Sequence, residues 1–176
     1  ASRAAAWLRW ALVLCGCSQS GACAVVDIEQ RRWIFQPTQE AWGPGVEAAR
    51  GMQEAWIDYV SAHPEHPGTA VRLHGLWLPQ SQAQAPALLF LHGLRWDVRA
   101  SAPRMRQLHA LGFSVLAIDY RGFGRSSGAL PSETLVAEDA HAAWAWLARK
   151  QPQTRRFLFG HSLGGAIAVR LAQEVP

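Results

Sequence analysis

The segment Arg156-Phe-Leu-Phe-Gly160-His161-Ser162-Leu163-Gly164-Gly165 carries the strongest structural signal in the chain. It is a short apolar run, followed by G-x-S-x-G and small residues that can open a helix. This is the sequence form of a nucleophile elbow, a sharp strand-to-helix turn that presents a reactive serine. The serine backbone is strained in such a turn, and Gly160 and Gly164 let strand and helix approach closely. The helix then begins beneath the hydroxyl, so its amide dipoles face any negative charge that forms there.

From residue 86 onward, apolar runs alternate with helical patterns, which predicts a mostly parallel sheet with helices on both faces. The apolar runs predict strands that are buried on both sides. Two helices are expected between them, with Ser101 and Ser132 as N-caps. The predicted strands are Ala87–Leu91, Phe113–Ile118 and Arg156–Phe159, and the predicted helices are Ala102–Leu111 and Glu133–Lys150.

Upstream of this region the pattern predicts an antiparallel hairpin. Residues 56–60 alternate apolar and polar side chains, and a proline-containing loop separates them from a second strand, Ala70–Leu78. Residues 32–37 are expected to form an extended lead-in. Residues 41–51, which contain Pro44 and several glycines, are expected to form a loop.

Residues 1–24 differ from the rest of the chain. A basic start, a short apolar core and small residues predict an export signal. Leu14-Cys15-Gly16-Cys17 resembles a bacterial lipobox, which would make Cys17 a lipidated anchor and place the protein in the bacterial cell envelope. A plain cleaved signal and an amphipathic segment of a cytosolic protein stay open as alternatives. Residues 25–176 would then form the second unit, a hydrolase-type domain that is incomplete.

Composition argues against several other classes of protein. The net charge is +4, but the arginines are scattered and form no basic stripe, so nucleic-acid binding is not expected. All three cysteines lie within the first 23 residues, so the rest of the chain has no disulfide framework and no thiol nucleophile. His63 and His66 have a metal-like spacing, but the prolines around them indicate a solvated turn. No metal and no cofactor is expected.

Two more motifs stand in the right order before the elbow. Leu91-His92-Gly93-Leu94 follows the first buried strand, and Asp119-Tyr120-Arg121-Gly122-Phe123-Gly124-Arg125-Ser126 follows the next. Together the three motifs resemble the α/β-hydrolase superfamily, and within it a subgroup of serine hydrolases related to serine aminopeptidases. The resemblance covers about residues 31–176. It implies the α/β-hydrolase fold, with the C-terminal strands of that fold missing from this chain.

The resemblance also implies roles for individual residues. Ser162 would be the nucleophile, and the backbone N–H groups of Leu163 and Leu94 would hold the oxyanion. The subgroup commonly has Asn where this chain has Leu94, which removes a side-chain hydrogen bond but keeps the backbone donor. Structural roles at the site are implied for six residues: His92 and Gly93 in the oxyanion loop, Gly160 and Gly164 in the elbow, and Asp119 and Arg121 in the turn after the second strand. His161 is expected to point away from the site, so it is not assigned as the base.

The serine needs a base and an orienting carboxylate, which in this fold follow the nucleophile in chain order. After Ser162 the chain has one acid, Glu174, too far along the helix to serve, and all seven His residues precede the serine. We therefore expect this chain to be the N-terminal half to two-thirds of a longer hydrolase and to be inactive by itself. The elbow strand would be left as an exposed apolar sheet edge, which favours aggregation.

The expected activity is hydrolysis of an ester, thioester or amide through an acyl-enzyme, with a small-molecule or lipid-like acyl substrate. A non-catalytic binding protein with this fold, or an acyltransferase that uses the same serine, is an alternative. The glycines of 122–128 half-resemble a dinucleotide-binding loop, but the third glycine falls one place late, at Gly128, so a structural turn is the preferred interpretation.

Overall fold

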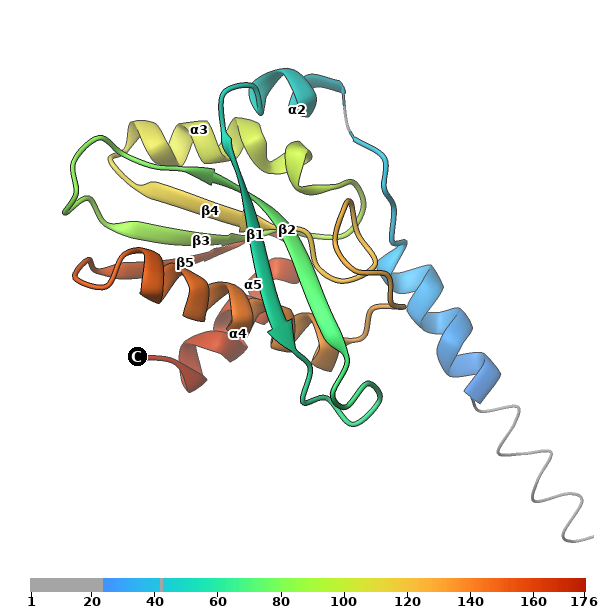
Figure 1. Ribbon diagram of the computed structural model, residues 1–176. Helices are drawn as coiled ribbons and strands as arrows, with labels where there is room; N and C mark the ends of the chain where they lie inside the picture. The colour runs from blue at the N-terminus through green and yellow to red at the C-terminus, as the bar shows by residue number, and fades with distance from the viewer. Residues whose placement is uncertain (1–23, 42) are drawn as a thin grey trace, which may run out of the picture.

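A computed structural model describes residues 24–41 and 43–176 (Figure 1). The predicted export signal and the lipidation of Cys17 fall on residues 1–23, outside the described part, so both stay predictions. None of the helices in the described ranges is long and apolar enough to span a bilayer.

The centre of the fold is a five-stranded sheet in the order β1-β2-β4-β3-β5. The first two strands form the predicted antiparallel hairpin, β2 runs antiparallel to β4, and β3 is parallel to both of its neighbours. Three strands are therefore parallel, and their carboxyl ends share one edge of the sheet. The strands are β1 (Gln53–Val60), β2 (Ala70–Leu78), β3 (Ala87–Leu91), β4 (Ser114–Ile118) and β5 (Arg156–Gly160).

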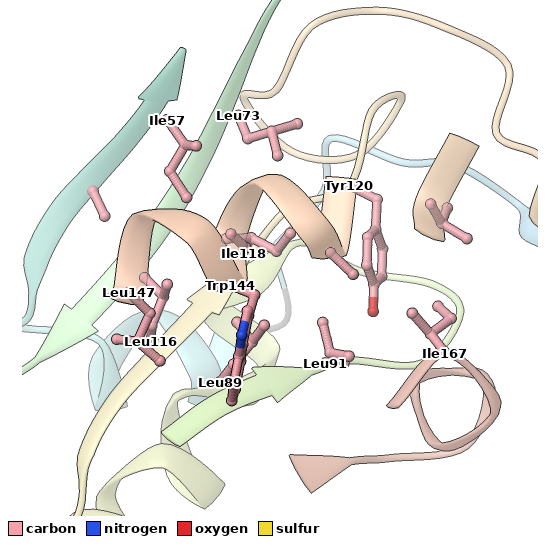
Figure 2. Packing of buried hydrophobic residues seen from close by; sticks show 14 of the residues in the cluster. Ile57, Leu73, Leu89, Leu91, Leu116, Ile118, Tyr120, Trp144, Leu147 and Ile167 are labelled. Carbon is pink, nitrogen blue, oxygen red and sulfur yellow. The ribbon is translucent and has the colours of Figure 1, made fainter. Parts of the chain in front are cut away.

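Helices cover both faces of this sheet, as Figure 1 shows. Because side chains alternate along a strand, each strand supplies both faces. Leu89 and Leu91 of β3 pack with α4 and α5, whereas Leu88 and Phe90 of the same strand pack against α3. Figure 2 shows the first of these clusters, in which Trp144 and Leu147 lie over the sheet. The helices are α2 (Gly43–Ala48), α3 (Ala102–Ala110), α4 (Glu133–Lys150) and α5 (Leu163–Glu174), and a short 3₁₀ turn, η1 (Val98–Ser101), precedes α3.

The predicted helix over Glu133–Lys150 is confirmed at both ends, and the Ser132 side chain caps it by accepting a hydrogen bond from the Leu135 N–H. The predicted cap at Ser101 is wrong. Ser101 already has helical dihedrals, because η1 runs directly into α3, and its side chain makes no capping bond. The capping side chain is that of Asp97, which accepts from the Arg99 N–H at the start of η1.

Two of the upstream predictions are also wrong. Residues 24–35 form a helix where an extended lead-in was expected over 32–37. Tertiary contacts hold this helix: Phe35 is buried in the core, and the Arg31 guanidinium donates to the carbonyls of Leu130 (2.7 Å) and Pro131 (3.0 Å). Within the predicted loop, α2 forms and packs against η1, where Gly45 lies so close to the Arg99 backbone that a side chain would overlap it.

The third predicted strand exists, but it is not buried on both faces. β5 lies at the edge of the described sheet, its residues are mostly half-buried, and Phe159 is 38% exposed. This apolar edge agrees with the expectation that the elbow strand is exposed in this chain.

Candidate active site

Ser162 lies at the turn between β5 and α5 and has an unusual backbone conformation. Its φ of 56° and ψ of −124° place a non-glycine residue in a region that L-amino acids rarely occupy. The side chain is exposed, and α5 begins at the next residue, Leu163. Strain of this kind costs about 1–3 kcal/mol and persists only where surrounding contacts enforce it. The serine is therefore held in the conformation that the elbow motif predicts.

The contacts that enforce this conformation come from glycines and backbone hydrogen bonds. The His161 N–H donates to the Leu91 carbonyl of β3 (3.0 Å), and the Gly164 N–H donates back to the His161 carbonyl (3.0 Å). A Cβ on Gly160 would overlap the Gly164 carbonyl, and one on Gly164 would overlap the Leu91 carbonyl. Close approach of strand, turn and helix is thus possible only because these two positions carry no side chain.

We expect Gly164→Ala to destabilise the fold by about 1–3 kcal/mol or more, because the added methyl group meets backbone atoms that cannot move aside. Gly165→Ala is the matched control, since a Cβ there lies 3.8 Å from its nearest neighbour, the Gly160 carbonyl oxygen. Urea-induced unfolding of the two variants measures the difference. Equal stability of the two variants would show that the elbow is not packed as described.

The loop after β3 passes beside the serine. A Cβ on Gly93 would lie 3.0 Å from Ser162 Cβ and 3.5 Å from its Oγ. Two consecutive residues further along, Arg95 (φ 67°) and Trp96 (φ 61°), adopt the left-handed conformation, which is a genuine outlier for a tryptophan. These two residues lie between Gly93, which is close to Ser162, and the start of η1 at Val98.

The His92 side chain packs in the core beneath the loop after β3 and contacts the Gly93 carbonyl. Its ring is buried against Tyr120, with centroids 4.6 Å apart, and its Nδ1 lies 2.6 Å from the Gly93 carbonyl oxygen. The Tyr120 hydroxyl donates to the His92 carbonyl (3.2 Å). Burial lowers the pKa of the His92 imidazole, which favours the neutral ring at physiological pH. These contacts suit the expected positioning role and give no support to a role in proton transfer.

Asp119 links the second motif to the same loop. It is buried, its Oδ1 accepts from the Val98 N–H of η1 (2.6 Å), and its Oδ2 lies 3.0 Å from the Nδ1 of buried His74. Its backbone carbonyl accepts from the Ser126 hydroxyl (2.6 Å). The carboxylate therefore ties the turn after β4 to the start of η1, which follows the loop after β3. His74 was not singled out from the sequence, because a lone histidine in a strand carries no motif.

The Arg121 side chain forms hydrogen bonds outside its own turn. Instead of only bracing its own turn, its side chain reaches α4, where Nε donates to Asp139 Oδ1 (2.8 Å) and an Nη donates to Glu138 (2.6 Å). The Tyr59 hydroxyl of β1 donates to the same Asp139 oxygen (2.6 Å). Burial raises the pKa of Asp139 to about 6, while the Arg121 charge opposes that rise. A buried polar network thus joins the turn, α4 and the hairpin.

Two further residues that the sequence raised as candidates are Glu174 and His161. Glu174 ends α5, far along the helix from Ser162, and pairs with His141 and Arg170 on the surface. His161 is exposed beside a small hollow of about 90 Å³ that Arg95 and Arg104 also line. Within residues 24–41 and 43–176, no three metal-binding side chains gather into a cluster. In the same ranges, no histidine or carboxylate is hydrogen-bonded to Ser162 Oγ.

Solved structures share this fold. An esterase of Pyrococcus furiosus superposes with a TM-score of 0.60 at 24% identity, over 78% of this chain and 50% of that one. A serine hydrolase without a lid from Xanthomonas campestris superposes with a TM-score of 0.56 at 20% identity, over 71% of this chain and 57% of that one. These likenesses confirm the α/β-hydrolase fold.

The chain is also similar in sequence to curated proteins. An uncharacterized protein of Mycobacterium tuberculosis (strain ATCC 25618 / H37Rv) is 38% identical over 160 residues, which is 89% of this chain and 54% of that protein. The lysophosphatidylserine lipase ABHD12 of Danio rerio is 33% identical over 103 residues, 56% of this chain and 26% of that protein. The chain thus spans about half the length of the mycobacterial relative. The family described as serine aminopeptidase S33 matches residues 82–176, the segment that contains the His92-Gly93 loop, the Asp119 turn and the elbow. The chain belongs to this family of α/β-hydrolases.

Proposed function

We propose that the full-length protein is a serine hydrolase that cleaves an ester, thioester or amide through an acyl-enzyme formed on Ser162. The observation that carries this proposal is the strained Ser162 backbone, which holds an exposed hydroxyl between the N-terminus of α5 and the backbone at Gly93. Strain at a solvent-facing residue has no evident structural use here, and such strain clusters at functional sites. This argues against the alternative of a non-catalytic binding protein.

In the proposed reaction, Ser162 Oγ attacks the substrate carbonyl carbon and its proton passes to a base. The negative oxygen that forms is stabilised by the N–H groups of Leu163 and Leu94. Leu163 is the first residue of α5, so its amide belongs to the N-terminal amides that lack a partner within the helix. Each such donor contributes about 3 kcal/mol of transition-state stabilisation.

The bond to the leaving group then breaks, and the leaving group takes the proton from the base. Water attacks the acyl-enzyme by the reverse sequence and releases the acid. The base and its orienting carboxylate belong downstream of Ser162 in chain order, as the fold places them. For the substrate we propose a lipid-like acyl ester, because one of the relatives is named as a lysophosphatidylserine lipase.

The test is covalent labelling of the full-length protein with a fluorophosphonate, together with hydrolysis of p-nitrophenyl butyrate. We expect one label per chain, which peptide mapping locates at Ser162, and loss of hydrolysis in proportion to labelling. Addition of an alcohol acceptor separates hydrolysis from acyl transfer, because only a transferase forms the new ester as its main product. A protein that neither labels nor turns over the ester refutes the proposal.

A further inference from the structure

A pocket of about 210 Å³ lies between the hairpin, α2 and η1. Neither the elbow nor the loop after β3 contributes to its lining. Aliphatic side chains and the Met52 thioether form part of its wall, and the rest of the wall is polar or charged. The polar and charged lining residues are Arg50, Glu54, His74, Arg99 and Arg125.

The His74 ring is the buried polar group of this pocket. Its side chain is 4% exposed, and its Nδ1 lies 3.0 Å from Asp119 Oδ2. The other ring nitrogen, Nε2, is buried and has no hydrogen-bond partner among the residues that the structure describes. It lies 3.9 Å from Glu54 Oε1, and both residues line the pocket. Because buried polar atoms are nearly always hydrogen-bonded, Nε2 is available to a ligand in this pocket.

The neighbours of His74 decide which kind of hydrogen bond Nε2 can make. The Asp119 carboxylate accepts from the Val98 N–H (2.6 Å) and accepts the hydrogen of His74 Nδ1 at its other oxygen. The neutral ring then presents a lone pair at Nε2. The hydrogen bond from Arg125 lowers the pKa of Glu54, so this carboxylate also only accepts. A ligand that reaches Nε2 must therefore bring its own hydrogen.

The arginines of the pocket favour an anionic ligand. Each of the three makes an ion pair that uses only part of its guanidinium group, which has five N–H donors. Only one of the acids in these pairs, Glu54, lines the pocket itself, so positive charge predominates on the lining. The pairs are Arg50 with Glu47, Arg99 with Asp97, and Arg125 with Glu54.

We propose that this pocket binds a phosphoryl group that carries a hydrogen-bearing oxygen, with its anionic oxygens on the guanidinium groups and its O–H donated to His74 Nε2. Guanidinium groups match phosphate oxygens in geometry and charge. The tetrahedral group sends oxygens in several directions at once, whereas an ionised carboxylate has two oxygens and no hydrogen to donate. The ligand is free phosphate, a small phosphate ester or the headgroup of a lipid. The proposal does not depend on the hydrolase function, and no sequence motif indicates it.

The first test is isothermal titration calorimetry of the full-length protein at pH 7 with inorganic phosphate and with sulfate. The two ions have the same shape, but only phosphate keeps a hydrogen at this pH. We expect one phosphate per chain, bound about tenfold or more tightly than sulfate, because sulfate leaves His74 Nε2 unpaired beside another oxygen. Equal affinity for the two ions, or no saturable binding of phosphate, would overturn the proposal.

Two arginine variants test the place of binding. Replacing His74 would leave the buried Asp119 carboxylate without its partner, so the variants are made at exposed positions. Arg50→Met removes a lining guanidinium whose side chain is 76% exposed, and we expect it to weaken phosphate binding about tenfold. Arg72→Met is the matched control, since its side chain is 61% exposed and does not line the pocket. Equal affinities in the two variants would contradict the proposed site.

Glu54→Gln tests the sign of the ligand charge. The substitution keeps the shape of an exposed side chain, removes a negative charge and releases Arg125. We expect it to tighten phosphate binding about threefold or more, with little change in thermal stability, because exposed ion pairs contribute little to folding. Weaker binding in Glu54→Gln would show that the pocket holds a cation, and the proposal would be wrong.

Competition experiments identify the source of the phosphoryl group. The competitors for bound phosphate are sn-glycerol 3-phosphate and vesicles of equal parts phosphatidylcholine and phosphatidic acid. Competition by glycerol 3-phosphate supports a soluble ester as ligand, and competition by the vesicles alone supports a lipid headgroup. If neither competes and Arg50→Met leaves phosphate affinity unchanged, phosphate binds elsewhere and the proposal is overturned.

Discussion

Ser162→Ala in the full-length protein is expected to lower ester hydrolysis on the order of 10⁴–10⁶-fold, because a covalent mechanism loses its nucleophile outright. Fluorophosphonate labelling should disappear at the same time. The variant should keep the fold, since alanine and serine have similar constraints at the positive φ of this position. Steady-state kinetics and labelling measure the loss, and Ser81→Ala, at an exposed loop serine, is the matched control.

A glycine at the same position separates catalysis from strain. Ser162→Gly should be as inactive as Ser162→Ala, but more stable by about 1 kcal/mol, because glycine adopts the φ of 56° without steric cost. Thermal and urea-induced unfolding compare the three proteins. Activity that survives in either variant would remove Ser162 from the mechanism, and a glycine variant less stable than the alanine variant would contradict the strain.

Arg121→Met is expected to destabilise the protein by about 3–5 kcal/mol, because it leaves a buried carboxylate without its cationic partner. The Arg121 side chain is 2% exposed and that of Asp139 is 0% exposed, so water does not replace the lost ion pair. Arg125→Met is the control, since its ion pair with Glu54 is half-exposed and such pairs contribute little. Urea-induced unfolding at pH 7 measures both variants.

The deficit of Arg121→Met should also depend on pH. The pKa of Asp139 in the folded protein is already raised from 3.8 to about 6 by burial, and Arg121 is its main opposing charge. Without that charge the pKa of Asp139 rises further. The folded state then binds a proton that the unfolded state releases, so stability falls as pH rises from about 4 through the folded pKa. We expect a larger deficit at pH 8 than at pH 5.

A double variant tests the origin of this deficit. Adding Asp139→Leu to Arg121→Met removes the stranded charge and should recover part of the lost stability, although Tyr59 then loses its acceptor. Recovery should also abolish the added pH dependence. A double variant as unstable as Arg121→Met, with the same pH profile, would show that lost packing and not the buried charge accounts for the effect.

The strand and helix positions downstream of residue 86 could be predicted because local and tertiary preferences agree there. The continuous apolar run of β3 favours a strand covered on both faces, and Ser132 followed by an amphipathic stretch favours a capped helix. The predictions failed where tertiary contacts outweigh local pattern. The helix over residues 24–35 and α2 both depend on what they pack against, namely the carbonyls before α4 and the backbone of η1.

Some features of the candidate site could likewise be predicted from the sequence, and others could not. The sequence by itself determined where the elbow at Ser162, the His92-Gly93 loop and the Asp119 turn lie, because each requires a glycine, a serine or a carboxylate at a fixed spacing along the chain. Only the tertiary structure decided that Asp119 ties η1 to His74, that Arg121 reaches α4, and that Ile34 comes to lie beside Leu163. Those relations join residues far apart in sequence, so they depend on the burial and backbone geometry of the assembled sheet.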